Sequence, residues 1–126
     1  MQLTSIATRY PASFFYDQLN QELATFPQDF SENLENLDFI VEDWAPEELE
    51  LQPGVLGLFS GIPLPKRSIF HTYEMPDIIY LFRMPILRHH MATGKAVQDI
   101  IRHVVVHEVA HYFGFSDADL LAQGLY

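Results

Sequence analysis

Apolar residues recur at helical spacing in two long stretches of the chain. Between residues 11 and 26 they occupy one side of the predicted helix, and Pro27 cannot continue it. Between residues 95 and 113 they point in nearly every direction around the axis, which is typical of a central, buried helix. Gly114 breaks this second pattern, and residues 116–123 predict a short terminal helix.

Shorter apolar runs at 37–43, 55–59 and 78–82 are typical of strands, because β-branched and aromatic residues dominate them. Pro76 and Pro85 bound the last run closely, and we expect it to be an edge strand. Glycines, prolines and charged residues between the runs predict a loop at 45–54 and an exposed turn at 60–67.

Helix, strands, helix and helix follow one another in the predicted order. This order predicts an α+β fold rather than a regular alternation of strands and helices. A length of 126 residues fits a single compact domain over residues 1–126. We expect a small mixed sheet packed on the N-terminal helix and on the central helix.

The net charge of −10 is unevenly distributed. Residues 1–54 hold 11 acidic side chains and one basic side chain, Arg9, whereas residues 55–126 hold six of each. Nucleic acid is therefore not an expected partner, because phosphate contacts need clustered Lys and Arg. The acidic half is either a solvated surface or a surface for a basic partner protein, in which case Glu47, Glu48 and Glu50 are candidates for the contact.

The chain contains no cysteine, which excludes disulfides, thiolate metal sites and a cysteine nucleophile. No stretch reaches the roughly 18 apolar residues of a membrane span, so no membrane partner is expected. The first residues do not have the pattern of a signal peptide. The default expectation is a cytoplasmic protein in which any metal is bound by His, Asp or Glu.

Three polar residues interrupt the apolar central helix in the order H-E-x-x-H. His107 and His111 are one turn apart on one face, and Glu108 flanks that face. Imidazoles at this spacing can bind one ion, with bonds of about 2.0–2.1 Å to zinc. The glutamate can accept a proton from a water molecule on that ion and pass it to a leaving amine. A buried carboxylate among valines is costly, which argues against an idle cluster.

Asp117 follows shortly after the motif, beyond the helix-ending Gly114. Two interpretations are open. Asp117 either returns across the turn as a third ligand, or stands with Asp119 in the first turn of the last helix behind a capping Ser116. Three protein ligands and one water molecule is the open arrangement of catalytic zinc.

The stretch HEVAHYFGFSD at 107–117 resembles the zincin metallopeptidases, and within them the metzincin pattern H-E-x-x-H-x-x-G-x-x-H/D. Together with LGLFSGIPLPKRS at 56–68 and DIIYLFRMPILR at 77–88, it resembles small bacterial proteins with a minimal matrix-metalloproteinase-like domain. The resemblance covers roughly residues 35–120. It implies a zincin-like fold and a zinc peptidase with one Zn2+ per chain, acting on a peptide or protein. It also implies that His107, His111 and Asp117 are the metal ligands and that Glu108 is the catalytic base.

An alternative is a metal-binding regulatory or interaction module without turnover. Nine residues follow Asp117, and they contain no methionine turn of the metzincin kind. The remaining histidines are expected to be structural or on the surface: His103 beside the motif, His89 and His90 in a polar loop, and His71 in another loop. Tyr112 is expected in the core. The strand at 78–82 either binds an extended peptide along its edge or only covers the core.

Overall fold

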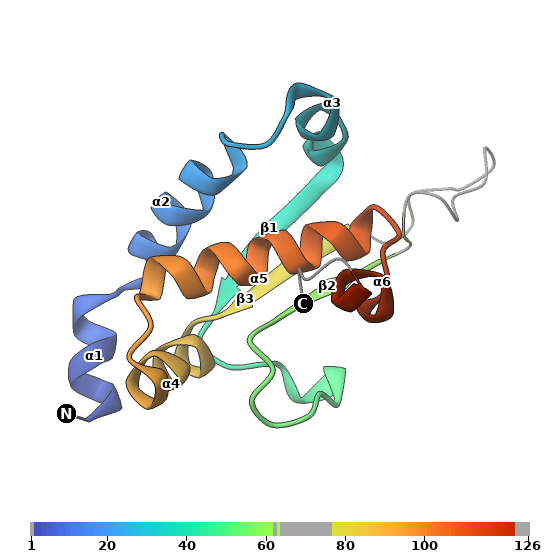
Figure 1. Cartoon of the computed structure of the whole chain (residues 1–126). Helices are drawn as coiled ribbons and strands as arrows, with labels where there is room; N and C mark the ends of the chain where they lie inside the picture. The colour runs from blue at the N-terminus through green and yellow to red at the C-terminus, as the bar shows by residue number, and fades with distance from the viewer. Residues whose placement is uncertain (1, 62, 64–76, 123–126) are drawn as a thin grey trace.

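The computed structural model describes residues 2–61, 63 and 77–122 (Figure 1). The elements, in chain order, are α1 Leu3–Arg9, α2 Ala12–Leu23, α3 Gln28–Ser31, the 3-10 helix η1 Glu32–Asn36, β1 Leu37–Glu42, the 3-10 helix η2 Glu47–Leu49, β2 Gly57–Ser60, β3 Asp77–Phe82, α4 Arg83–Thr93, α5 Val97–Tyr112 and α6 Asp117–Ala122. The predicted α+β class is confirmed. None of the described helices combines the length and the hydropathy that a membrane span requires.

The three strands form one mixed sheet in the order β1-β3-β2. β3 runs parallel to β1 and antiparallel to β2. The prediction that residues 78–82 form an edge strand is therefore wrong, since β3 is the central strand. Pro85 lies in the first turn of α4, where no backbone N–H partner is needed, and so it does not weaken the pairing of β3.

The long helix α5 crosses one face of the sheet, and α2 packs beside it (Figure 1). The hydrophobic core lies between these layers. Phe15 of α2, Ile79 and Leu81 of β3, and Ile101 and Val105 of α5 are all fully buried. Helix α5 packs on the sheet as predicted. The prediction that it is buried on nearly every side is wrong, because Arg102 and Val106 lie on an exposed face. Tyr112 is in the core as expected.

Three α-helices were not predicted, namely α1, α3 and α4. α1 precedes the expected first helix, and α4 occupies the place of the expected polar loop around His89 and His90. Both histidines therefore lie on a helix and not in a loop. The helical pattern of α4 is weak because its only buried residues, Ile86 and Leu87, are adjacent and do not recur at helical spacing. Gly94, with φ 75°, ends α4 in the left-handed conformation.

The other boundaries differ by a few residues from the expected ones. The helix expected at 11–26 spans Ala12–Leu23, and the helix expected at 95–113 spans Val97–Tyr112. The expected loop at 45–54 contains the short helix η2. Most of the turn expected at 60–67, and His71, lie outside the described residues.

Candidate metal centre

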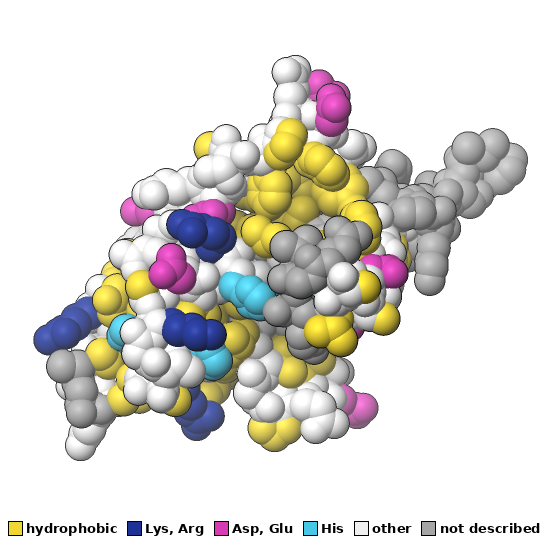
Figure 2. All heavy atoms as spheres, in the orientation of Figure 1, with side chains coloured by type: hydrophobic (Ala, Val, Ile, Leu, Met, Phe, Trp, Pro, Cys, Tyr) yellow, Lys and Arg dark blue, Asp and Glu magenta, His cyan; other side chains and the backbone are white. Residues whose placement is uncertain are grey.

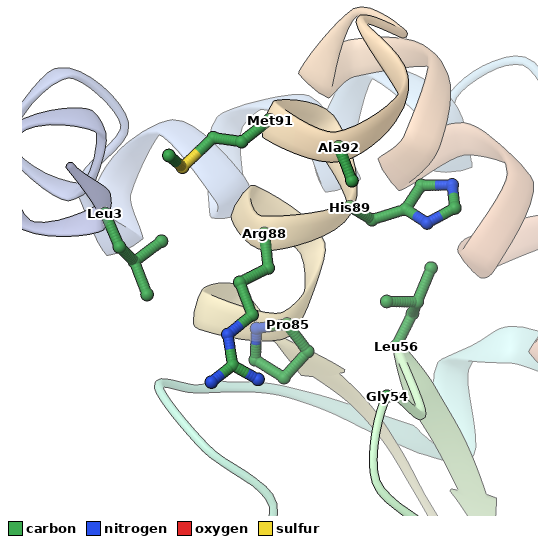
Figure 3. Close-up of a pocket in the computed structure, with 8 residues that line it drawn as sticks. All are labelled: Leu3, Gly54, Leu56, Pro85, Arg88, His89, Met91 and Ala92. Atoms are coloured by element: carbon green, nitrogen blue, oxygen red, sulfur yellow. The ribbon is translucent and has the colours of Figure 1, made fainter. Parts of the chain in front are cut away.

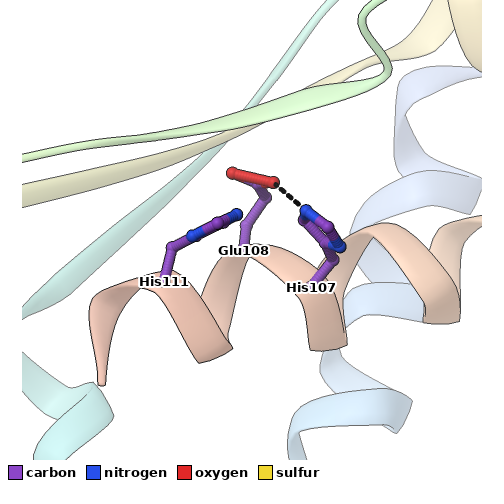
Figure 4. A group of neighbouring side chains, drawn as sticks. All are labelled: His107, Glu108 and His111. Atoms are coloured by element: carbon purple, nitrogen blue, oxygen red, sulfur yellow. Dashed lines mark ion pairs between the residues drawn. The ribbon is translucent and has the colours of Figure 1, made fainter. Parts of the chain in front are cut away.

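Helix α5 presents both motif histidines on the same face (Figure 4). The ring centroids of His107 and His111 are 4.7 Å apart, and the two side chains are 18% and 26% exposed. Together with a carboxylate oxygen of Glu108, they offer three ligand atoms that lie within 4.8 Å of one another. The two histidines are half-buried and Glu108 is buried, so the cluster is in contact with solvent only on the histidine side.

Glu108 reaches from α5 to the sheet. Its Oε1 accepts a hydrogen bond from the backbone N–H of Phe59 in β2, with a distance of 2.8 Å. Its Oε2 lies 4.0 Å from Nε2 of His107 (Figure 4). One carboxylate oxygen is thus held by the sheet while the other faces the histidines.

The pKa of Glu108 is raised because burial disfavours the charged carboxylate. The hydrogen bond from Phe59 opposes this shift, as do the positive charges of His111 and His107, while Asp117 adds to it. A raised pKa brings the group closer to the range in which a carboxylate both takes up and releases a proton.

Strand β2 approaches α5 closely at Gly57. A Cβ atom at this position would lie 2.5 Å from Cγ1 of Val104 and 2.7 Å from the carbonyl oxygen of Tyr80. Only glycine fits such a gap without displacing the strand. This close packing lets the backbone of Phe59 reach Glu108. Neither Gly57 nor Phe59 was a sequence candidate, although a glycine inside a strand pattern is a signal for close backbone approach.

The turn after α5 brings Asp117 back to the histidines. Gly114 has φ 97°, and the N–H of Phe115 donates to the carbonyl of Ala110 at 3.0 Å. Oδ1 of Asp117 then lies 3.1 Å from Nε2 of His107 and 3.0 Å from Nε2 of His111. The structure therefore brings together all four residues that the sequence singled out.

The start of α6 is capped by other residues. Ser116 Oγ accepts from the N–H of Asp119 at 3.1 Å, and Asp119 Oδ2 accepts from the N–H of Ser116 at 2.8 Å. These two bonds form a reciprocal cap. The hydrogen bonds from Ser116 also lower the pKa of Asp119. Capping is therefore complete without the carboxylate of Asp117, which faces the histidines instead.

The orientation of His111 suits a metal ligand. Its Nδ1 lies 3.0 Å from the carbonyl oxygen of Phe115, and because a carbonyl only accepts, Nδ1 carries the hydrogen. Without a hydrogen on Nε2, as metal binding requires, the ring would present a lone pair toward the Asp117 oxygen. Two acceptors at this distance repel unless a proton or a cation lies between them. A backbone carbonyl that orients a histidine in this way is a common support of metal sites.

The separations also suit zinc. Ligand atoms about 2.0–2.1 Å from a tetrahedral zinc ion lie about 3.3 Å from each other. The distances of 3.1 Å and 3.0 Å from Asp117 to the two histidines are close to this value. Two imidazole nitrogens and one carboxylate oxygen form a set that zinc accepts, and the donors present here fit that metal.

A cleft of about 420 Å³ opens onto this cluster. Its lining comes from two segments, the residues Val55, Leu56, Gly57 and Leu58 before and within β2, and His103, Val104, His107, Glu108, His111 and Asp117 on the helical side. A second cleft of about 370 Å³ continues past Phe59 and Gly114. His103, expected to be structural, lies on the wall of the first cleft.

No curated protein matches the chain. The family model described as zincin-like metallopeptidase matches residues 34–125, which is most of the chain and includes β1, β2, β3, α4, α5 and α6. With a mixed sheet crossed by the helix that carries the HExxH motif, the chain belongs to the zincin-like metallopeptidase family.

Proposed function

We propose that this protein is a zinc-dependent peptidase. In this proposal His107, His111 and Asp117 hold one zinc ion, and Glu108 is the general base. The observation that carries it is the convergence of Oδ1 of Asp117 on Nε2 of both histidines, at 3.1 Å and 3.0 Å. Family membership supports zinc and peptide chemistry in general, and the residue roles rest on this geometry.

Zinc bound at such a site polarises a peptide carbonyl and lowers the pKa of water. The protein's own part is proton transfer. Oε2 of Glu108 is on the side of the histidines and would take the proton of the attacking water, and the same oxygen would release it to the nitrogen of the leaving amine. Oε1 stays hydrogen-bonded to Phe59, so the carboxylate keeps its orientation throughout.

The substrate would lie along the edge of β2 that no other strand of the described residues covers. The N–H of Phe82 donates to the carbonyl of Leu56, so the backbone groups of Leu56, Leu58 and Ser60 face β3. Those of Gly57 and Phe59 consequently face away from β3. The N–H of Phe59 is already bonded to Glu108, so a peptide would pair with the carbonyl of Phe59 and with the N–H and carbonyl of Gly57. Backbone pairing with an extended peptide at such an edge is a common mode of recognition. The proposed peptide-binding edge strand is therefore β2 and not the strand at 78–82.

Metal analysis and a peptide digest test the proposal together. We expect about one zinc per chain in protein purified without added metal, and cleavage of a mixed peptide library. Glu108→Gln should keep zinc and lower the cleavage rate by about 10²- to 10⁴-fold, the usual contribution of a general base. Glu32→Gln, an exposed glutamate in η1, is the matched control and should cleave like the parent chain.

Two outcomes contradict the proposal. Protein without bound zinc, whose stability does not change on adding it, would remove the metal centre. Zinc binding without Glu108-dependent cleavage would leave a metal-binding module in place of a peptidase.

A further inference from the structure

A separate cavity, of about 580 Å³, adjoins the 420 Å³ cleft of the candidate metal centre (Figure 3). Its apolar lining comes from α1, α4 and the segment before β2, namely Leu3, Gly54, Leu56, Pro85, Met91 and Ala92. Leu56 also lines the metal cleft. The two hollows therefore share a wall on the segment that leads into β2.

The charged group at this cavity is Arg88 of α4, and its neighbour His89 adds an imidazole. His89 projects toward the side of Leu56, and the Arg88 side chain extends along Pro85 (Figure 3). Among the described residues, no carboxylate lines the cavity. In a chain with 17 acidic and 7 basic side chains, this is a local reversal of the overall charge.

Arg88 is held in place without being neutralised. Its guanidinium lies 5.1 Å from the ring centroid of Trp44, in a cation–π contact. In the part of the chain that the structure describes, Arg83 and Arg102 have carboxylate partners, in Asp43 and Glu22, whereas Arg88 has none within 4.0 Å. Arg88 is thus a positioned cation whose planar donors are available for a carboxylate from outside.

Basic side chains continue from this cavity toward the metal cleft. The pKa of His103, on the wall of the cleft, is lowered by burial and then by the positive charges of His107, Lys95 and His89. In Figure 2 the Lys, Arg and His side chains of this face gather over its left and central part, and hydrophobic side chains dominate around α3. A bound peptide that extends in this direction meets basic side chains.

The distance along β2 defines which substrate residue would reach the cavity. Phe59, whose N–H is bonded to Glu108, marks the position of the catalytic base along β2. Leu56 precedes it by three residues, which is a distance of about 10 Å along the strand at roughly 3.3 Å per residue. A peptide extended beside β2 has the same rise, so its residue about three positions from the cleaved bond lies next to Leu56.

We propose that the cavity beside α4 is a specificity subsite that takes an acidic side chain about three residues from the cleaved bond, with Arg88 and His89 as its recognition residues. This inference rests on the proposed function, because it needs a peptide along β2. The substrate class it names is acidic peptides. The apolar floor around Leu56 and Met91 would pack against the methylene groups of that side chain.

A binding measurement on peptides tests the subsite. The Glu108→Gln protein, loaded with zinc, is applied to an array of C-terminally amidated peptides in which Glu, Gln or Lys is placed at each position in turn. We expect Glu to be bound about two- to fivefold more tightly than Gln at one position, the usual effect of an exposed ion pair. Arg88→Gln combined with His89→Gln should abolish the preference, and Arg88→Lys should retain most of it.

Arg9→Gln is the control, because it removes the same charge from an exposed residue outside the cavity. Absence of an acidic preference, its persistence in the Arg88 and His89 double variant, or an equal loss in Arg9→Gln would overturn the proposal. Thermal unfolding of each variant identifies a folding defect, and if the double variant has one, the single variant Arg88→Gln, which should lose most of the preference, carries the test. Cleavage by the parent chain is measured separately, so failure of the peptidase function is distinguishable from failure of the subsite.

Discussion

The two halves of the candidate metal centre are built differently. His107, Glu108 and His111 lie on a 16-residue helix whose buried side packs on the sheet, and Glu108 is 8% exposed. Asp117 stands on the six-residue helix α6 beyond a glycine turn, and its side chain is 60% exposed. The first half is held by packing on several sides, and the second by a few hydrogen bonds of the turn. A centre of this kind has a rigid base on which one adjustable carboxylate closes.

The largest loss of zinc affinity is expected on removing a histidine from the half on α5. His107→Ala should lower the affinity for zinc by more than about 100-fold, which is the upper end of what loss of a supporting partner costs. Isothermal titration of metal-stripped protein with zinc measures this. His103→Ala, one turn earlier on the same helix, is the matched control and should bind zinc like the parent chain. Equal affinities for all three proteins would contradict a metal centre on this face.

Removing the Asp117 carboxylate, the exposed half of the centre, should lower zinc affinity less than removing a histidine. We expect Asp117→Asn to lower zinc affinity by about 10- to 100-fold, less than the histidine variant, because the two imidazoles remain. Asp119→Asn changes the neighbouring cap and should cost about 1 kcal/mol of stability with little effect on zinc. Titration and thermal unfolding of the two variants separate these roles. If both variants lost zinc affinity to the same extent, Asp117 would act only through the turn.

The support of the rigid half by the sheet can be tested at Gly57. Gly57→Ala should displace β2 from α5 at a cost of about 1–3 kcal/mol, because the new methyl group meets Val104 and the carbonyl of Tyr80. The bond from Phe59 to Glu108 then lengthens, and cleavage should fall by about 10- to 100-fold while zinc stays bound.

The control for that variant is Gly94→Ala. Its φ of 75° makes alanine unfavourable by about 1 kcal/mol, but nothing lies within 4 Å of the new methyl group. Its cleavage rate should be unchanged in spite of the lower stability. An unaffected rate in Gly57→Ala would show that the Phe59 bond does not matter for the base.

The smallest expected effect is a pH dependence of stability. The folded-state pKa of Glu108 lies above its ordinary value of 4.5, so ionisation of this group costs stability above that folded pKa and costs none below 4.5. Metal-stripped Glu108→Gln should therefore be more stable than the metal-stripped parent chain at neutral pH, and the difference should vanish as the pH falls below 4.5. Urea unfolding at several pH values measures it. A constant difference would mean that the carboxylate is not disfavoured by its surroundings.

The contrast between the α5 cluster and Asp117 also explains how much of the site could be predicted from the sequence. The helix with HExxH was predictable because helical spacing is a local property, and two imidazoles one turn apart face the same way on any helix. The role of Asp117 stayed open at the sequence level, because capping by Ser116 and Asp119 becomes visible only in three dimensions.

Long-range features were not predictable in the same way. Flanking prolines suggested an edge position for β3, but the pairing of β1 and β2 on its two sides depends on the whole sheet. The N–H of Phe59 is chemically the same as that of any other residue, and its importance comes from where Gly57 lets the strand lie. α4 was missed since it buries few side chains despite its length.

The proposed zinc ligands all lie within residues 107–117, and this has a consequence for folding. Closing so short a loop loses little chain entropy, so the ligands can assemble as soon as α5 and the glycine turn form. The contact from Phe59 to Glu108 spans 49 residues and has to wait for the sheet. Zinc would then bind to an early, local intermediate, whereas the base would reach its working orientation only in the last steps of folding.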